Sequence, residues 1–112
     1  MTPNRMYVVF RDEYLDAAVN PVTTSAPFPM EGNKVVMAIN VANISTGNVE
    51  FVLEGRYDGL AWIKLKTGIT ATAFGYDDEP ITAVDVAFVR VLATAASSAK
   101  ARFDTTLVMS SQ

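Results

Sequence analysis

Apolar and polar side chains alternate with a period of two along several separate runs of this chain. Between residues 34 and 44, four apolar residues fall on one face of an extended segment: Val35, Met37, Ile39 and Val41. The same period recurs in residues 49–56, 61–66, 81–94 and 101–109. β-Branched residues are frequent in these runs, which favours strands over helices. In residues 49–56 the second face is polar except for Val52, and one polar face is typical of an antiparallel sheet.

Turn-forming residues separate these runs. They are found at residues 45–48 (STGN), at Asp58-Gly59, at Thr67-Gly68 and at residues 95–100 (AASSAK). Asp-Gly between two β-rich runs is among the strongest local signals for a hairpin. A Thr- and Ala-rich strand is expected at 69–76, and a polar loop closed by Pro80 at 76–80. With seven to eight short strands and no convincing helix, the sequence predicts an all-β fold: an antiparallel, jelly-roll-like β-sandwich.

Three prolines interrupt the segment from residue 12 to residue 33. Pro21, Pro27 and Pro29 exclude a long helix and a central strand, because proline lacks a backbone N–H and has a fixed φ. We therefore expect an extended loop here, with a short strand at 22–25.

The prolines also divide the chain into two regions within one domain. Residues 1–33 form an N-terminal strand and a proline-rich arm, and residues 34–112 form the β-sandwich body. Phe28 and Met30 project from the stiff A-P-F-P-M backbone of the arm. They either cover one end of the core or contact a neighbouring subunit.

The chain contains neither cysteine nor histidine. This excludes disulfides, thiolate chemistry, Ser-His and Cys-His dyads and nearly all structural zinc sites. A calcium site needs about six to eight converging oxygen ligands, so we interpret the consecutive carboxylates Asp77, Asp78 and Glu79 as a solvated loop. We predict no catalytic residue, no metal and no cofactor, and we expect that the protein is not an enzyme.

Charge and hydropathy restrict the partners. Nine Lys and Arg residues are scattered among twelve Asp and Glu residues, and the net charge is −3. Without a basic stripe to neutralise phosphates, nucleic acid is not expected as a partner. The N-terminal apolar run is cut off by Arg11, Asp12 and Glu13, unlike a signal peptide, and no run is long enough to span a bilayer. We expect synthesis in the cytoplasm and no membrane partner.

Two aromatic residues, Tyr57 and Trp62, could contact a ligand. An exposed tryptophan on a β-sandwich can stack on a sugar ring, whereas a buried one anchors a core. Because Trp62 follows a tight hairpin and is flanked by Ile63 and Leu65, the sequence favours a core or sheet-packing role for it. Tyr57, at the turn, is the better candidate for an exposed ring.

The run V-E-F-V-L-E-G-R-Y-D-G-L-A-W-I-K-L, residues 49–65, resembles a pattern in small β-sandwich virion proteins of tailed bacteriophages. There a strand ending in Gly leads into an Asp-Gly turn, a Trp and an aliphatic pair, and an F-V-R-V strand, here residues 88–91, follows later. The resemblance covers about half of the chain, and discoidin-like carbohydrate-binding modules share the hairpin. Phage decoration, or cement, proteins are similarly small, are made in the cytoplasm and bind assembled shells through sandwich surfaces, often as trimers.

The resemblance implies a structural virion protein of the capsid decoration or cement type, made in the host cytoplasm. Its partners would be the major capsid protein or other particle subunits, and it would form a homo-oligomer, such as a trimer. The expected contact residues are Met6, Tyr7, Val8, Phe10, Phe28 and Met30. Removal of residues 1–30 would leave a folded sandwich that no longer attaches.

Two alternatives remain open. One is another head or tail accessory protein of a phage. The other is a discoidin-like carbohydrate-binding module that uses Tyr57, Trp62 and Asp77.

Overall fold

The computed structural model describes residues 3–71, 75–82 and 84–111. These residues form nine strands and no helix, and hence no helix that could cross a membrane. The strands are β1 (Pro3–Asp16), β2 (Val22–Thr24), β3 (Phe28–Pro29), β4 (Lys34–Ile44), β5 (Asn48–Arg56), β6 (Ile63–Ala71), β7 (Gly75–Ile81), β8 (Phe88–Ala96) and β9 (Lys100–Ser110).

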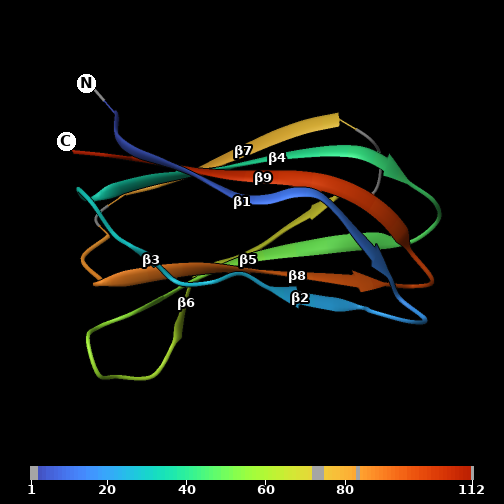
Figure 1. Cartoon of the computed structure of the whole chain (residues 1–112), viewed down its shortest axis with the longest axis horizontal. Coiled ribbons are helices and arrows are strands. Elements are labelled where there is room, and N and C mark those ends of the chain that lie inside the picture. The colour runs from blue at the N-terminus through green and yellow to red at the C-terminus, as the bar shows by residue number, and fades with distance from the viewer. Residues whose placement is uncertain (1–2, 72–74, 83, 112) are drawn as a thin grey trace.

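The strands build two antiparallel sheets that lie face to face (Figure 1). Sheet A has the order β1-β9-β4-β7, and sheet B has the order β2-β8-β5-β6, with β3 also paired to β8. Strand β1 thus pairs with β9, β2 and β3 with β8, β4 with β7, and β5 with β6. Such nested pairing, from the ends of the chain inward, is the jelly-roll arrangement. The predicted all-β, jelly-roll-like sandwich is confirmed.

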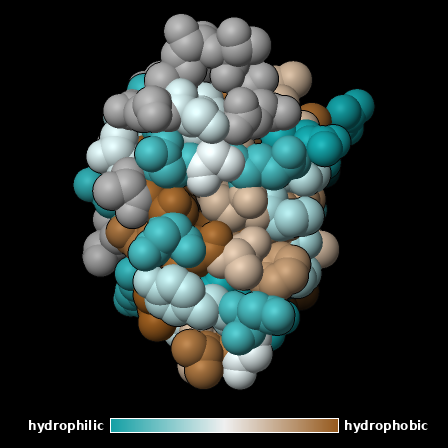
Figure 2. Space-filling model, turned by 90° about the vertical axis from the view of Figure 1, so that its left-hand side faces the viewer, coloured by the Kyte–Doolittle hydropathy of each residue, from teal (hydrophilic) through white to brown (hydrophobic). Residues whose placement is uncertain are grey.

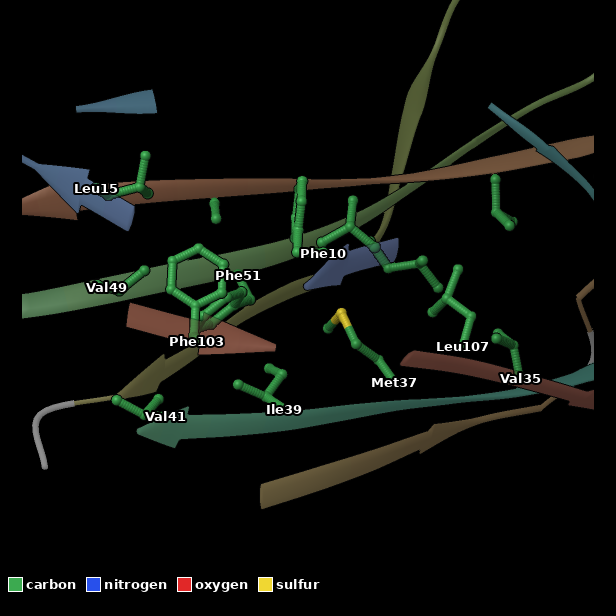
Figure 3. Packing of buried hydrophobic residues seen from close by; sticks show 14 of the residues in the cluster. Phe10, Leu15, Val35, Met37, Ile39, Val41, Val49, Phe51, Phe103 and Leu107 are labelled. Carbon is green, nitrogen blue, oxygen red and sulfur yellow. The ribbon is translucent and has the colours of Figure 1, made fainter. Parts of the chain in front are cut away.

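The core lies between the sheets and is formed by the inward side chains of the alternating runs (Figure 3). Phe103 of β9 makes edge-to-face contacts with Phe10 of β1 and Phe51 of β5, with ring centroids 5.8 and 4.9 Å apart. Because Phe51 belongs to sheet B and the other two rings to sheet A, this aromatic cluster joins the layers. The inward faces predicted for residues 34–44, 49–56 and 101–109 are confirmed.

The first thirty residues take part in both sheets. Strand β1 pairs with β9 over its whole length, with three register shifts, and Asp12 in this irregular part has a φ of 48°. Such bulges bend an edge strand, which lets β1 follow the curvature of the sandwich. The expected short strand at 22–25 corresponds to β2, and both β2 and β3 extend sheet B along β8.

Two expected connections are wrong. The polar loop expected at 76–80 belongs to β7, an edge strand of sheet A that pairs with β4 and places Pro80 opposite Val36. Charges and proline are tolerated there because an edge strand has no second neighbour to bond. The turn expected at Thr67-Gly68 lies inside β6, where the pairing with β5 shifts register between Leu53 and Phe51. The strand expected from residue 81 begins only at Phe88.

Candidate interaction surfaces

The outer face of sheet A carries a row of apolar side chains that crosses all four strands. In the register, Met6 of β1 lies opposite Val108 of β9, Val108 opposite Val36 of β4, and Val36 opposite Pro80 of β7. These residues alternate with buried ones such as Val35 and Leu107, so they face away from the core. In the next outward-facing row of the sheet, Val8 of β1 lies opposite Thr106 of β9, and Thr106 lies opposite Ala38 of β4. We call the set the apolar strip: Met6, Val8, Val36, Ala38, Pro80 and Val108.

The apolar strip is exposed at both edges of sheet A, on β1 and at Pro80 of β7. Met6 is 65% exposed and Val8 is 48% exposed, whereas Val36, Ala38 and Val108 are half-buried. Large apolar side chains gathered on one exposed face of a small protein often mark an interaction site.

Ion pairs lie at both ends of β1. At the start, the Arg5 Nε donates to Glu31 Oε2 at 2.7 Å, and this hydrogen bond and the charge of Glu31 raise the pKa of Arg5. Towards its end, the Arg102 guanidinium lies 5.0 Å from the Tyr14 ring centroid and 3.6 Å from Asp12. Arg102 alternates with buried residues of β9 and therefore shares the outer face of Val108, so this charged group borders the apolar strip at one end, whereas Arg5 lies over the Tyr7 ring on the other side of β1.

The other expected contact residues face the interior. Phe10 is 6% exposed and belongs to the core. Tyr7 and Phe28 are half-buried and contact each other, with ring centroids 4.7 Å apart, and Met30 packs against the core. Phe28 and Met30 thus cover one end of the core, which was one of the two options for the proline-rich arm.

That end of the sandwich carries both termini (Figure 1). Met30 N–H donates to Ala87 O and Val84 N–H donates to Asn33 O, so the segments that precede β4 and β8 close the gap between the sheets. Figure 2 shows this end: hydrophobic side chains gather across its middle with hydrophilic ones among them, and further hydrophobic ones lie at its lower edge.

A second cluster lies on the outer face of sheet B. Arg56 of β5 pairs with Phe88 of β8 on one side. Trp62 lies on the other side of Arg56, because the next residue, Ile63, pairs with Gly55. The Arg56 guanidinium carbon lies 5.2 Å from the Trp62 ring centroid and 5.4 Å from that of Phe88.

Arg90 completes this cluster. Its guanidinium carbon lies 4.2 Å from the Trp62 ring centroid, and its Nε donates to Glu54 Oε1 at 2.8 Å. Trp62 is accordingly half-buried on the outer face of sheet B and is not part of the core. We call Glu54, Arg56, Trp62, Phe88 and Arg90 the arginine–aromatic cluster. The period of two in residues 54–56 and 88–90 places Glu54, Arg56, Phe88 and Arg90 on one face of their strands. Nothing in the sequence predicts that these side chains contact Trp62.

The residues of the carbohydrate alternative are spread over the molecule. The Tyr57 hydroxyl donates to Asp85 Oδ1 at 3.0 Å, and this hydrogen bond, together with the carboxylate charge, raises the pKa of Tyr57. Trp62 lies on sheet B, whereas Asp77 belongs to β7 in sheet A, where it pairs with Ile39. Across the described part of the chain, no three acidic side chains are grouped as a metal site.

Comparison with known proteins gives a likeness in fold. No protein-family model and no curated protein matches the sequence. A chain in the structure of infectious bursal disease virus strain Gx superposes with a TM-score of 0.55 at 8% identity, over 96% of this chain and 32% of that one. A chain of the T13 particle of the same virus gives 0.52 at 10% identity, over 94% and 31%. This chain spans about a third of the length of those chains. It has a β-sandwich fold that is also found in structures of a virus.

Proposed function

We propose that the protein is a structural component of a virus particle, and more narrowly a decoration or cement protein of a tailed-bacteriophage shell. The apolar strip on the outer face of sheet A carries the proposal, because it is the exposed apolar surface that crosses a whole sheet. The jelly-roll fold, shared with chains in structures of a virus, supports a structural role.

Attachment would work through burial of the strip against a neighbouring subunit. Complete burial of a Val or Met side chain contributes about 1.5–3 kcal/mol, and about half to two thirds of the surface of Val8 and Met6 is available for this. Such a contact is weak for one copy, since association also costs translational and side-chain entropy. Attachment at several points, as in a trimer, multiplies weak contacts into tight binding.

The partner we propose is the major capsid protein or another particle subunit, with the protein itself present as a homo-oligomer in the virion. Synthesis in the host cytoplasm fits this role. A position elsewhere on the head or on the tail is the nearest alternative.

The carbohydrate alternative has weaker support. A sugar platform needs an open aromatic face, and the Trp62 ring lies against the Arg90 guanidinium. The Tyr57 hydroxyl is engaged by Asp85, and Asp77 lies in the other sheet.

The test is to locate the protein on particles. Antibodies against the purified chain are applied to particles isolated from its biological source, and gold labelling is viewed by electron microscopy alongside mass spectrometry of the same particles. Labels over the whole shell support decoration, and labels on tails assign an accessory role there. Particles that lack the protein contradict a structural virion role.

A pair of variants then tests the strip. Val8→Asp places a charge in the apolar strip, whereas Val19→Asp makes the same change at an 80%-exposed position in the turn after β1. We expect Val8→Asp to reduce co-sedimentation with stripped particles at least tenfold and Val19→Asp to leave it unchanged, with both variants folded by circular dichroism. Equal binding by both variants would show that the apolar strip does not contact the particle.

A further inference from the structure

We propose that the arginine–aromatic cluster is a docking site for an acidic segment of a partner protein, whose carboxylate binds the Arg56 guanidinium. This site is separate from the apolar strip, because it lies on the outer face of the other sheet. It holds whether or not the partner belongs to a virus particle.

The first argument is the placement of Arg56. Its neighbours across the sheet are Trp62 on one side and Phe88 on the other, with ring centroids 5.2 and 5.4 Å from the guanidinium carbon. Aromatic faces hold a guanidinium through cation–π attraction and fix its plane. The arginine is therefore already ordered, so binding an anion costs little further side-chain entropy.

The second argument is the difference between the two arginines. Arg90 is neutralised by Glu54, whose side chain is 14% exposed. For Arg56, no carboxylate oxygen lies within 4.0 Å among residues 3–71, 75–82 and 84–111, and its Nε is buried without an acceptor. Its positive charge has lost part of its hydration without gaining an ion-pair partner.

A partly desolvated cation attracts an anion more strongly than a hydrated one, because water screens the pair less. The Nε itself faces the protein, so the anion would meet the terminal amino groups of the guanidinium. A planar carboxylate fits that edge with two parallel hydrogen bonds.

The third argument is the local charge. Lys64 lies opposite Glu54 in the register and is exposed, so Arg56, Arg90 and Lys64 lie close together on this face, with Glu54 paired to Arg90. Asp58 lies in the adjacent turn, and Asp85 beside that turn accepts a hydrogen bond from Tyr57. The chain as a whole has a net charge of −3. Among the three cations of this face Arg56 has no ion-pair partner in the described part of the chain, and an unpaired cation is complementary to a carboxylate of an acidic partner.

The fourth argument identifies the partner as protein. The turn beside the cluster exposes Tyr57 (42%) and Leu60 (62%), which offer apolar contact next to the cation. Tryptophan and arginine with apolar surroundings are the composition of protein interaction hot spots. A peptide with a carboxylate beside apolar side chains matches the cluster, whereas a nucleic acid needs a longer row of cations.

The experiment selects ligands from a random twelve-residue peptide library against the full-length chain. The enriched peptides are synthesised and titrated, with fluorescence of Trp62, the single tryptophan of the chain, as the readout. We expect enrichment of Asp or Glu beside apolar residues. Replacing that acidic residue by its amide should weaken binding at least tenfold, and Arg56→Gln should do the same.

Three controls make the result specific. Arg102→Gln removes another arginine that lies over an aromatic ring, Tyr14, and should leave peptide binding unchanged. Arg56→Lys keeps the charge but loses the planar edge, and should bind severalfold more weakly than the unchanged chain. Thermal unfolding of each variant shows that it is folded.

Several outcomes would overturn the proposal. These are the absence of any enriched peptide, enriched peptides without an acidic residue, and peptides that bind Arg56→Gln as well as the unchanged chain. Displacement of the peptide by inorganic phosphate at lower concentration than by acetate would assign the site to phosphate instead. None of these results depends on particle labelling, so this proposal and the proposed function can fail separately.

Discussion

Phe103 is the side chain on which the two layers meet, because it contacts Phe10 in its own sheet and Phe51 in the other. All three rings are buried (Figure 3). Phe103→Ala should lower the free energy of unfolding by about 3–5 kcal/mol, through lost burial and the cavity that remains. Urea denaturation measures this, and Val19→Ala at an 80%-exposed site should change stability by less than about 0.5 kcal/mol. A loss of under about 1 kcal/mol for Phe103→Ala would contradict this packing.

Tyr57 should titrate at a higher pH than an ordinary tyrosine. Its hydroxyl donates to Asp85, a bond that the tyrosinate cannot make, and the carboxylate also disfavours a second negative charge, so the pKa is raised. The bond favours the folded state below the unfolded pKa of about 10 and is lost as the pH rises through the folded pKa. NMR of the Tyr57 ring against pH measures the shift.

Asp85→Asn should bring the pKa of Tyr57 back toward its usual value. Asp58→Asn, next in sequence but not bonded to the hydroxyl, should change that pKa less. If both variants shift it equally, the hydrogen bond to Asp85 is not the main cause.

Among single residues, the alternation of apolar and polar side chains predicts burial best in regular strands, where successive side chains must point to opposite faces of the sheet. The inward positions of β4, such as Val35 and Met37, were predicted correctly because period two fixes their face. The contacts of Trp62 were not predicted, since it lies just before a strand, and its neighbours Arg56 and Arg90 belong to two other strands. Contacts between distant segments leave no local pattern to read.

At the level of elements, the turn between β4 and β5 depends on a glycine. Gly47 has a φ of +84°, and a Cβ built there would lie 2.5 Å from the carbonyl oxygens of Ala96 and Ser97. Gly59, between β5 and β6, has nearly the same φ, +80°, but nothing lies within 4 Å of its Cβ position. The pair therefore separates backbone strain from steric clash.

Both glycine-to-alanine changes should destabilise the fold, but Gly47→Ala more. Gly59→Ala should cost about 1–2 kcal/mol, the usual penalty for a left-handed conformation. Gly47→Ala should exceed that, because two backbone carbonyls must also move. Urea denaturation of both variants gives the difference, and equal losses would contradict the close approach at Gly47.

Edge strands are the elements that the sequence predicted least well. Residues 76–80 contain three acidic residues and a proline, which is also the composition of a loop. Only the pairing of β7 with β4 shows that this segment is an edge strand. The interior strands β4, β5 and β9, in contrast, were found in nearly their full length, because two neighbours and a buried face demand alternation.

At the scale of the whole molecule, the jelly roll joins the beginning of the chain to its end. Strand β1 pairs with β9, and β2 and β3 pair with β8, so the first thirty residues touch the last twenty-five. Strands that are so far apart in the sequence pair late and slowly during folding. Closing the long loop between them costs chain entropy before any contact has formed to compensate for it. The sequence predicted the sandwich and the hairpin of β5 and β6, but not which distant strands meet, because alternation carries no information about partners.

Truncation of residues 1–30 tests whether the N-terminal segment is a separable arm or part of the fold. The arm hypothesis predicts that residues 31–112 still form a sandwich. The pairings predict the reverse: β9 loses its neighbour, and the core loses Phe10 and Leu15, which are 6% and 1% exposed. Two large core side chains together contribute on the order of 5 kcal/mol, comparable to the whole stability of a small domain.

We therefore expect the truncated chain to lack cooperative unfolding and dispersed NMR signals, in contrast to the full chain. A synthetic peptide of residues 1–30 added in trans should restore both, because the pairing surfaces of β8 and β9 remain in the truncated chain. The same peptide carrying Phe10→Asp should not, since a charge cannot be buried beside Phe103 without a partner. A truncated chain that unfolds cooperatively by itself would show that the sandwich closes without β1 and that the N-terminal segment is free to contact other subunits.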